Sequence, residues 1–150
     1  MSFLIAGCGV EAGDSANWGE DFEAAKAMAA EKKLPILADF TGSDWCGWCI
    51  KLDREVFSRE AFKTFADKSL ILFKADFPNR KPQSAAIKKQ NEGLQAKYGI
   101  RGYPTILLLD AGGNVLAQTG YQPGGAEGYV QHLTDLLKKQ EETKPEKKGE

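Results

Sequence analysis

The sequence has few cysteines and histidines and no excess charge of either sign. Its 150 residues include three cysteines and one histidine, and 20 basic residues stand against 21 acidic ones. Because these charges are balanced and interspersed, the chain has no cationic field that would hold a phosphate backbone, so nucleic acid is excluded as an expected partner. No apolar run approaches the ~20 residues of a membrane-spanning helix. One soluble domain with a buried core is therefore expected.

Two of the three cysteines are separated by two residues, in the segment Trp-Cys-Gly-Trp-Cys at 45–49. An apolar run at 34–40 precedes this segment, and Tyr-Pro-Thr at 103–105 opens a second apolar run. Cysteines at this spacing can occupy the first turn of a helix, where unpaired N–H groups and the helix dipole favour a thiolate at the first sulfur. Cys46 is therefore the candidate nucleophile. Cys49, on the same helical face, is the candidate resolving thiol that attacks a mixed disulfide formed at Cys46.

A cysteine pair of this kind also forms half of many zinc sites, but a structural zinc ion takes four protein ligands. The only further cysteine and histidine are Cys8, near the N-terminus, and His132, on the last predicted helix. We therefore expect no metal and no cofactor, and interpret His132 as an ordinary surface residue. A Cu(I) carrier that uses both thiolates is a weaker alternative, since the chain has no methionine-rich or additional cysteine ligand set.

The first residues leave two interpretations open. Ile-Ala-Gly-Cys at 5–8 resembles a bacterial lipobox, but only 3–6 is apolar and no Lys or Arg precedes it, whereas an export signal needs an apolar core of about 7–15 residues. In the first interpretation, which we prefer, residues 1–17 hold the end of an export signal and a flexible tether. The protein is then periplasmic or exported, with a candidate lipid anchor at Cys8. In the second, Cys8 is incidental and the protein is cytoplasmic.

Periodicity and turn residues predict alternating helices and strands, with Ser58 as an N-cap and Gly99 at a helix end. The predicted helices span 20–33, 46–55, 58–66, 84–98 and 126–139, and the predicted strands span 34–40, 69–77, 103–110 and 115–119. Strands joined through helices imply parallel crossovers, and the Gly-Gly turn before the last strand adds an antiparallel pair. This gives an α/β domain over 18–139, with a mixed sheet and helices on both faces. Residues 140–150 are expected to form a disordered charged tail.

This order of elements is that of the thioredoxin fold, and the motifs agree. The segment 45–49 is similar to the thioredoxin active-site motif, and 98–105 resembles the segment that holds the thioredoxin cis-proline. The resemblance covers about residues 18–138. More closely, 40–46 and 120–125 resemble the exported DsbH-type thioredoxin-like reductases. The resemblance implies a thiol-disulfide oxidoreductase, in the direction of protein-disulfide reduction, with a partner reductase as electron donor.

The resemblance also implies roles for single residues. Pro104 matches the cis-proline, so we expect a cis peptide bond after Tyr103. The backbone at Tyr103 would pair with an extended substrate strand, and the candidate substrate-binding residues are Trp45, Gly47, Trp48, Tyr103 and Pro104. Asp39 resembles the buried acid that accepts or relays the proton of Cys49.

The turn before the cysteines departs from the thioredoxin pattern. From Asp39 to Cys46 the chain is one residue longer, because Gly-Ser-Asp at 42–44 enlarges the turn. Whether the Asp39 side chain points toward Cys49 is therefore open. Asp44 is either a surface carboxylate that competes with Asp39 for this role or a cap of the turn. A peptide-binding or chaperone module with an inert disulfide remains the alternative function. No dimerisation segment is recognisable, which favours a monomer.

Overall fold

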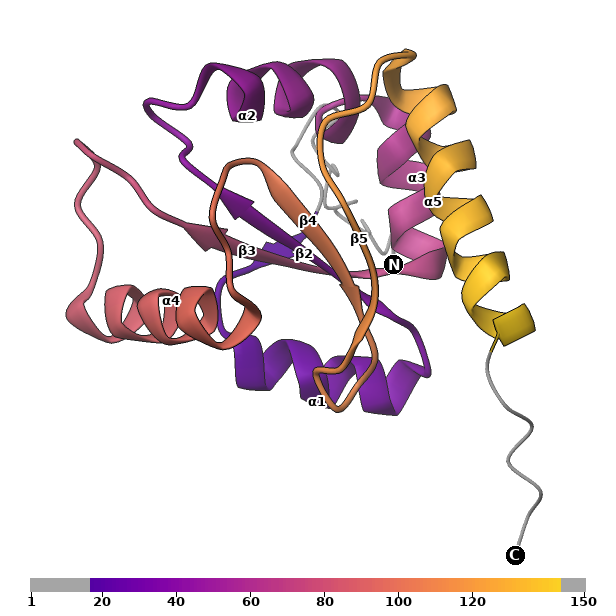
Figure 1. Cartoon of the computed structure of the whole chain (residues 1–150), viewed down its shortest axis with the longest axis horizontal. Helices are drawn as coiled ribbons and strands as arrows, with labels where there is room; N and C mark the ends of the chain where they lie inside the picture. The colour runs from indigo at the N-terminus through magenta and orange to yellow at the C-terminus, as the bar shows by residue number, and fades with distance from the viewer. Residues whose placement is uncertain (1–16, 144–150) are drawn as a thin grey trace, which may run out of the picture.

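The structure, a computed structural model, describes residues 17–143, which form a five-stranded sheet with helices on both faces (Figure 1). The strands are β1 (Trp18–Gly19), β2 (Ile36–Thr41), β3 (Ile71–Asp76), β4 (Thr105–Leu109) and β5 (Val115–Thr119), in the spatial order β1-β3-β2-β4-β5. β1 and β2 run parallel to β3, while β4 runs antiparallel to both β2 and β5. The predicted mixed sheet and thioredoxin fold are confirmed, with β1 as an additional short edge strand.

The helices divide between the two faces of the sheet. They are α1 (Phe22–Lys32), α2 (Gly47–Leu52), the π-helical turn η1 (Asp53–Phe57), α3 (Glu60–Ser69), α4 (Ala85–Tyr98) and α5 (Gly125–Thr143). α1 and α4 cover one face, and α2, α3 and α5 cover the other (Figure 1). Successive side chains of a strand point to opposite faces, so Ile36 and Ala38 of β2 join the core under α1 while Leu37 joins the core under α3 and α5. The sheet is therefore buried on both sides.

Capping residues fix the ends of α1 and α4. The Asp21 carboxylate accepts the N–H of Ala24 at 3.1 Å, and the Ser84 hydroxyl accepts the N–H of Ile87 at 3.1 Å. Such bonds satisfy backbone donors that the first turn of a helix leaves free. α4 ends as predicted at Gly99, which has φ 63° in the left-handed region that favours glycine.

The helix boundaries on either side of η1 differ from the prediction, and the helix predicted to end at Ala66 continues to Ser69. The helix expected over 46–55 divides into α2 and η1, and the next helix begins after Arg59 rather than after Ser58. The Ser58 hydroxyl does not cap a helix, because it donates back to the carbonyl of Arg54 at 3.1 Å. The Ser58 N–H donates to the carbonyl of Asp53 at 2.8 Å and closes the π-helical turn. A π turn holds more residues than an α turn, which shifts the start of α3 along the chain.

The last helix is longer than predicted. α5 continues to Thr143, so residues 140–143, expected in a disordered tail, are helical. Leu136 and Leu137 pack against the second core and hold the helix on the sheet near its end. None of the helices within residues 17–143 has the length and hydropathy to cross a membrane. Residues 1–16, with the candidate lipobox and Cys8, and residues 144–150 lie outside the described part of the chain.

Candidate active site

Cys46 and Cys49 form a disulfide at the start of α2. Cys46 is the N-cap residue of α2, and its Sγ accepts the N–H of Cys49 at 3.2 Å. The two Cα atoms are 5.2 Å apart, and the side chains are 7% and 5% exposed. Because an N-cap position faces unpaired N–H groups and the positive end of the helix dipole, a thiolate at Cys46 is favoured once the bond is reduced.

Trp45, the residue before Cys46, contacts two aromatic residues of other segments, and we call Trp45, Phe77 and Tyr103 the first wall. Trp45 is 44% exposed and donates from Nε1 to the carbonyl of Phe77 at 2.7 Å. Its ring meets the edge of Tyr103 at a centroid distance of 5.7 Å, and the Phe77 ring lies 5.3 Å from that of Tyr103. The first wall therefore joins the cysteine turn to the segment that precedes β4.

Tyr103 also belongs to a tightly bonded turn. The Tyr103–Pro104 peptide bond is cis, the isomer expected from the sequence. Gln95 of α4 donates to the Tyr103 hydroxyl, and the Thr105 hydroxyl donates to the carbonyl of Gly102 at 2.7 Å. A Cβ at Gly120 would lie 3.2 Å from the Pro104 carbonyl oxygen. The absence of a side chain at Gly120 thus lets the loop after β5 approach this turn closely.

A second group of side chains, which we call the second wall, consists of Trp48, Lys51 and Tyr121. Trp48 is 57% exposed, and its ring centroid lies 5.1 Å from that of Tyr121. The Lys51 ammonium lies 5.0 and 5.3 Å from these two ring centroids, within the range of cation–π attraction. The Tyr121 hydroxyl donates to Glu55 of η1. Sequence reasoning missed Lys51, although its position three residues after Trp48 on a predicted helix was the available signal.

Asp39 lies buried within β2, on the sheet face that carries Leu37 and α2 rather than on the face of α1. It is 4% exposed, and its Oδ1 has no hydrogen-bond partner among the described residues. Burial raises the pKa of Asp39 to about 7, although Lys74, its neighbour in β3, acts to lower it. Burial likewise raises the pKa of Tyr129 in α5, and the charge of Asp39 adds to that rise. Asp39 can therefore exchange a proton near neutral pH.

Asp44 has the opposite environment. Its carboxylate accepts the N–H groups of Asn79, Arg80 and Lys81 at 2.8, 2.7 and 2.9 Å. These bonds, that of Asn79 first, lower the pKa of Asp44 to about 2. Of the two interpretations left open by the sequence, the structure therefore supports the capping carboxylate, and the segment that Asp44 caps lies 35 to 37 residues further along the chain.

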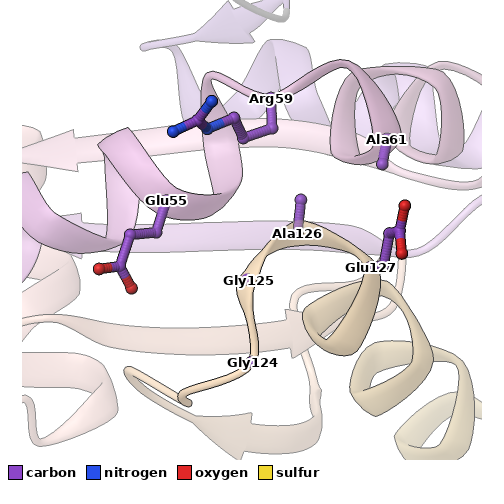
Figure 2. Close-up of a pocket in the computed structure, with 7 residues that line it drawn as sticks. All are labelled: Glu55, Arg59, Ala61, Gly124, Gly125, Ala126 and Glu127. Atoms are coloured by element: carbon purple, nitrogen blue, oxygen red, sulfur yellow. The ribbon is translucent and has the colours of Figure 1, made fainter.

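Behind the second wall, a shallow pocket of about 510 Å³ lies between η1 and the start of α5 (Figure 2). It is lined by two acidic residues, one basic residue and small residues: Glu55, Arg59, Ala61, Gly124, Gly125, Ala126 and Glu127. Arg59 Nε donates to the carbonyl of Arg54 at 3.0 Å, and Glu55 is engaged by Tyr121. The pocket contains neither cysteine, so we do not assign it to the exchange site.

His132 is half-buried rather than an ordinary surface residue. Its Nε2 lies 2.8 Å from the Thr119 hydroxyl, and its ring packs against Tyr129 at a centroid distance of 5.7 Å. The contact with Thr119 joins α5 to β5. Within residues 17–143, no three His, Cys, Asp or Glu side chains come together as metal ligands would.

Comparisons with known proteins agree with this geometry. A family model described as Thioredoxin-like matches residues 17–111. Disulfide bond reductase DsbH of Chlamydia pneumoniae is 36% identical over 119 residues, which are 79% of this chain and 72% of that protein. The solved structure of a DsbH oxidoreductase superposes with a TM-score of 0.79 at 35% identity, covering 85% of this chain and 88% of that one.

A more distant relative is a much longer protein. Thiol:disulfide interchange protein DsbD of Yersinia enterocolitica is 32% identical over 114 residues, which are 73% of this chain but 18% of DsbD. The shared part includes the cysteine pair of this chain's exchange site. With the Cys46–Cys49 disulfide at the start of α2, these matches show that the chain belongs to the thioredoxin-like family of thiol-disulfide oxidoreductases.

Proposed function

We propose that the chain reduces protein disulfides through the Cys46/Cys49 pair. The observation that carries this proposal is the disulfide at the N-terminal end of α2, where a reduced Cys46 is favoured as a thiolate. The two aromatic walls beside it support a polypeptide substrate. The direction of the reaction is supported by the relative DsbH, whose name is disulfide bond reductase.

The proposed exchange has two steps. The Cys46 thiolate attacks one sulfur of the substrate disulfide, forms a mixed disulfide and expels the other substrate sulfur as a thiolate. Cys49 then loses its proton and attacks Cys46 Sγ, which forms the Cys46–Cys49 bond and expels the second substrate thiolate. Two electrons pass from the protein dithiol to the substrate disulfide. A partner reductase, itself a dithiol protein, restores the reduced pair by the reverse exchange.

In this scheme Asp39 accepts the proton of Cys49. Its burial, the unpartnered Oδ1 and a pKa of about 7 support the assignment, since a base of that pKa exchanges protons readily at neutral pH. Asp39 also shares the sheet face covered by α2, which carries Cys49.

The proposed substrate site lies between the two walls. An extended substrate segment would pair with the backbone at Tyr103, beside Pro104, and contact the exposed rings of Trp45 and Trp48. Gly47 has open space where a side chain would stand, so a substrate can approach the backbone between the cysteines.

An equilibrium redox titration of the pair against thiol buffers, followed by tryptophan fluorescence, tests the function. We expect a reversible two-electron transition near about −270 mV, the value of thioredoxin. A midpoint near about −120 mV would instead make the protein an oxidant. A protein without any reversible transition would not be an oxidoreductase of this kind.

A peptide-binding or chaperone module is the second candidate. The low exposure of both sulfurs beside exposed tryptophans favours it, because such a surface can hold a peptide without exchange. Alkylation of the reduced protein separates the two functions. The reductase requires Cys46 to react with iodoacetamide much faster than an ordinary thiol at pH 6, whereas an inert Cys46 supports the binding module.

We further infer an exported protein that acts as a monomer with a partner reductase. The resemblance of 5–8 to a lipobox supports export and a lipid anchor at Cys8. Expression of the natural gene in bacteria tests this inference, since Cys8→Ser should release the protein from the membrane fraction. Equal distribution of both forms would contradict the anchor, and a dimer in sedimentation would contradict the monomer.

A further inference from the structure

We propose that Asp44 is a positioning residue that sets the substrate-binding surface beside Cys46. Asp44 holds residues 79–81 against the cysteine turn, and the same connection begins at Phe77, which binds the Trp45 ring of the first wall. The inference rests on the proposed reductase function and adds a determinant of how strongly a protein substrate binds.

Asp44 holds its loop through several hydrogen bonds. One carboxylate oxygen accepts the N–H of Asn79, and the other accepts those of Arg80 and Lys81. In addition, the Arg80 guanidinium donates from Nη2 to the Asp44 carbonyl at 2.8 Å. Hydrogen bonds to an ionised carboxylate are roughly twice as strong as neutral ones. One side chain therefore fixes three successive peptide groups of an exposed loop.

Phe77 connects this loop to the ring of Trp45. The loop follows Phe77 directly, and the Phe77 carbonyl accepts the Trp45 Nε1 proton at 2.7 Å. The Phe77 N–H donates to the Thr41 carbonyl at 2.8 Å, so Phe77 extends the pairing of β3 with β2. Asp44 and Trp45 are neighbours in the chain, and both bind the same short segment, one through a carboxylate and the other through an indole.

The Trp45 ring packs tightly against its own turn. A Cβ at Gly42 would overlap the Trp45 indole, so the ring lies directly on this glycine. The Tyr103 ring meets Trp45 on another side. The Trp45 ring is thus bounded by Gly42, the Phe77 carbonyl and Tyr103, and Phe77 lies at the start of the connection whose residues 79–81 Asp44 holds.

The remaining residue of the enlarged turn makes the same connection. Ser43 donates to the Asp76 carboxylate from its N–H at 3.0 Å and from its hydroxyl at 2.6 Å, and the Lys81 ammonium donates to the Ser43 hydroxyl at 3.1 Å. All three residues of 42–44 therefore face the first wall or the segment that follows β3. This gives the enlarged turn a specific purpose, which is to anchor the first wall.

The test compares a protein disulfide with a small one. Asp44→Asn places an amide N–H₂ against at least one backbone donor, which removes at least one bond to the loop. With insulin as substrate, we expect kcat/KM to fall roughly tenfold, mostly through KM, which corresponds to the loss of about one hydrogen bond. The rate with the small disulfide DTNB and the midpoint potential should stay unchanged, because neither depends on the first wall. The fluorescence emission of the variant should shift as Trp45 gains solvent.

Asp110→Asn is the matched control. Asp110 also caps a turn with its carboxylate, accepting the N–H groups of Gly112 and Asn114 at 2.9 Å each. That turn follows β4, at the opposite end of the strand from Pro104. Asp110→Asn should therefore leave both the insulin and the DTNB rates at the wild-type values.

A double-mutant cycle isolates the path through Trp45. In a Trp45→Ala background, Asp44→Asn should cause no further loss with insulin, because the ring that Asp44 positions is gone. Equal losses with insulin and DTNB, an insulin rate unchanged by Asp44→Asn, or a full tenfold loss in the Trp45→Ala background would each overturn the inference. If Asp44→Asn does not fold, Trp45→Phe, which removes the Nε1 donor to Phe77 together with part of the indole ring, must show the same selective loss with insulin. A wild-type protein that reduces neither substrate would refute the proposed function instead.

Discussion

Single carboxylates of this protein differ according to their solvation and hydrogen bonding. Asp39 is buried with an unpartnered oxygen and has a pKa of about 7, whereas Asp44 accepts three N–H groups and has a pKa of about 2. They are five positions apart in the sequence. Desolvation disfavours the ionised form of the first, and donated hydrogen bonds favour that of the second. Asp39 is thereby suited to proton exchange and Asp44 to a permanent structural bond.

The pKa of Asp39 predicts how stability depends on pH. In the folded oxidised chain the pKa of Asp39 is about 7, so the carboxyl keeps its proton up to about that pH. In the unfolded chain the pKa has its ordinary value of 3.8, and the proton is lost above that pH. Between these values the folded state binds more protons, so the free energy of unfolding falls as pH rises, by at most about 1.4 kcal/mol per pH unit. Asp39→Asn cannot ionise and removes this decline. The variant should gain stability relative to wild type between pH 4 and pH 8, as measured by urea unfolding of both oxidised proteins.

The same variant tests the proposed proton transfer. At pH 7 Asp39→Asn should slow release of the mixed disulfide, because Cys49 loses its proton acceptor, while attack by Cys46 is retained. Stopped-flow fluorescence of the two steps separates them. If the stability difference between variant and wild type is the same at pH 4 and pH 8, Asp39 titrates normally and its assignment as proton acceptor fails.

Among the elements, those with local end signals were predictable. α4 has a serine cap before its first residue and a glycine after its last, and the sequence places both ends within one residue. β1 could not be predicted, because its two residues have no periodicity and exist as a strand only through pairing with β3. The start of α3 was misplaced because a serine before an apolar run resembles a cap, whereas here it closes η1.

The residues of the candidate site also divide into those that local sequence signals predict and those that only the fold brings together. The cysteine spacing and the Tyr-Pro motif are local and point to the exchange site directly. The contacts that build the walls join residues far apart in the sequence: Trp45 and Phe77 are 32 positions apart, and Tyr121 and Glu55 are 66 positions apart. Neither propensity nor spacing reveals such pairs, since they depend on how β3 and the β5–α5 connection lie against α2.

The connection between β5 and α5 is predicted to contribute to substrate binding through the second wall. The Tyr121 hydroxyl fastens this connection to η1 through Glu55. Tyr121→Phe keeps the ring beside Trp48 but removes the bond, so the second wall should loosen and KM for insulin should rise at an unchanged midpoint potential. Tyr98→Phe is the control, because it removes a comparable bond, to the Gly113 carbonyl at 2.6 Å, on the other face of the sheet. Equal KM values for the two variants would contradict a role of the second wall in binding.

For the whole molecule, the arrangement concentrates exchange chemistry at one end of a sheet that is otherwise buried. β2 leads into the cysteine turn, the segment after β3 carries the loop held by Asp44, and the turn before β4 supplies Tyr103 and Pro104. The two cores on either side of the sheet hold these three segments in a fixed relation. The redox state of one bond at this end should therefore be coupled to the stability of the entire domain.

The coupling between redox state and stability predicts whether the protein reduces or forms disulfides in its substrates. The Cys46–Cys49 bond closes a loop with a sequence separation of 3, which in the chain-entropy model restricts the unfolded chain by only about 2 kcal/mol. The whole difference in stability between the two redox states equals the shift of the reduction potential from that of the unfolded chain, about 1.4 kcal/mol per 30 mV. A reductase requires the oxidised domain to be the more stable form, since a fold that favours the disulfide makes the dithiol a better reductant.

Urea unfolding of the protein with and without a phosphine reductant measures this difference. We expect the midpoint of unfolding to lie at a higher urea concentration for the oxidised domain, at an unchanged slope. A Cys46→Ser, Cys49→Ser variant, which keeps Cys8, should unfold identically in both buffers and so controls for effects of the reductant. A reduced domain that is more stable than the oxidised one would be the behaviour of a strong oxidant, and the chain would then form disulfides in its substrates rather than reduce them.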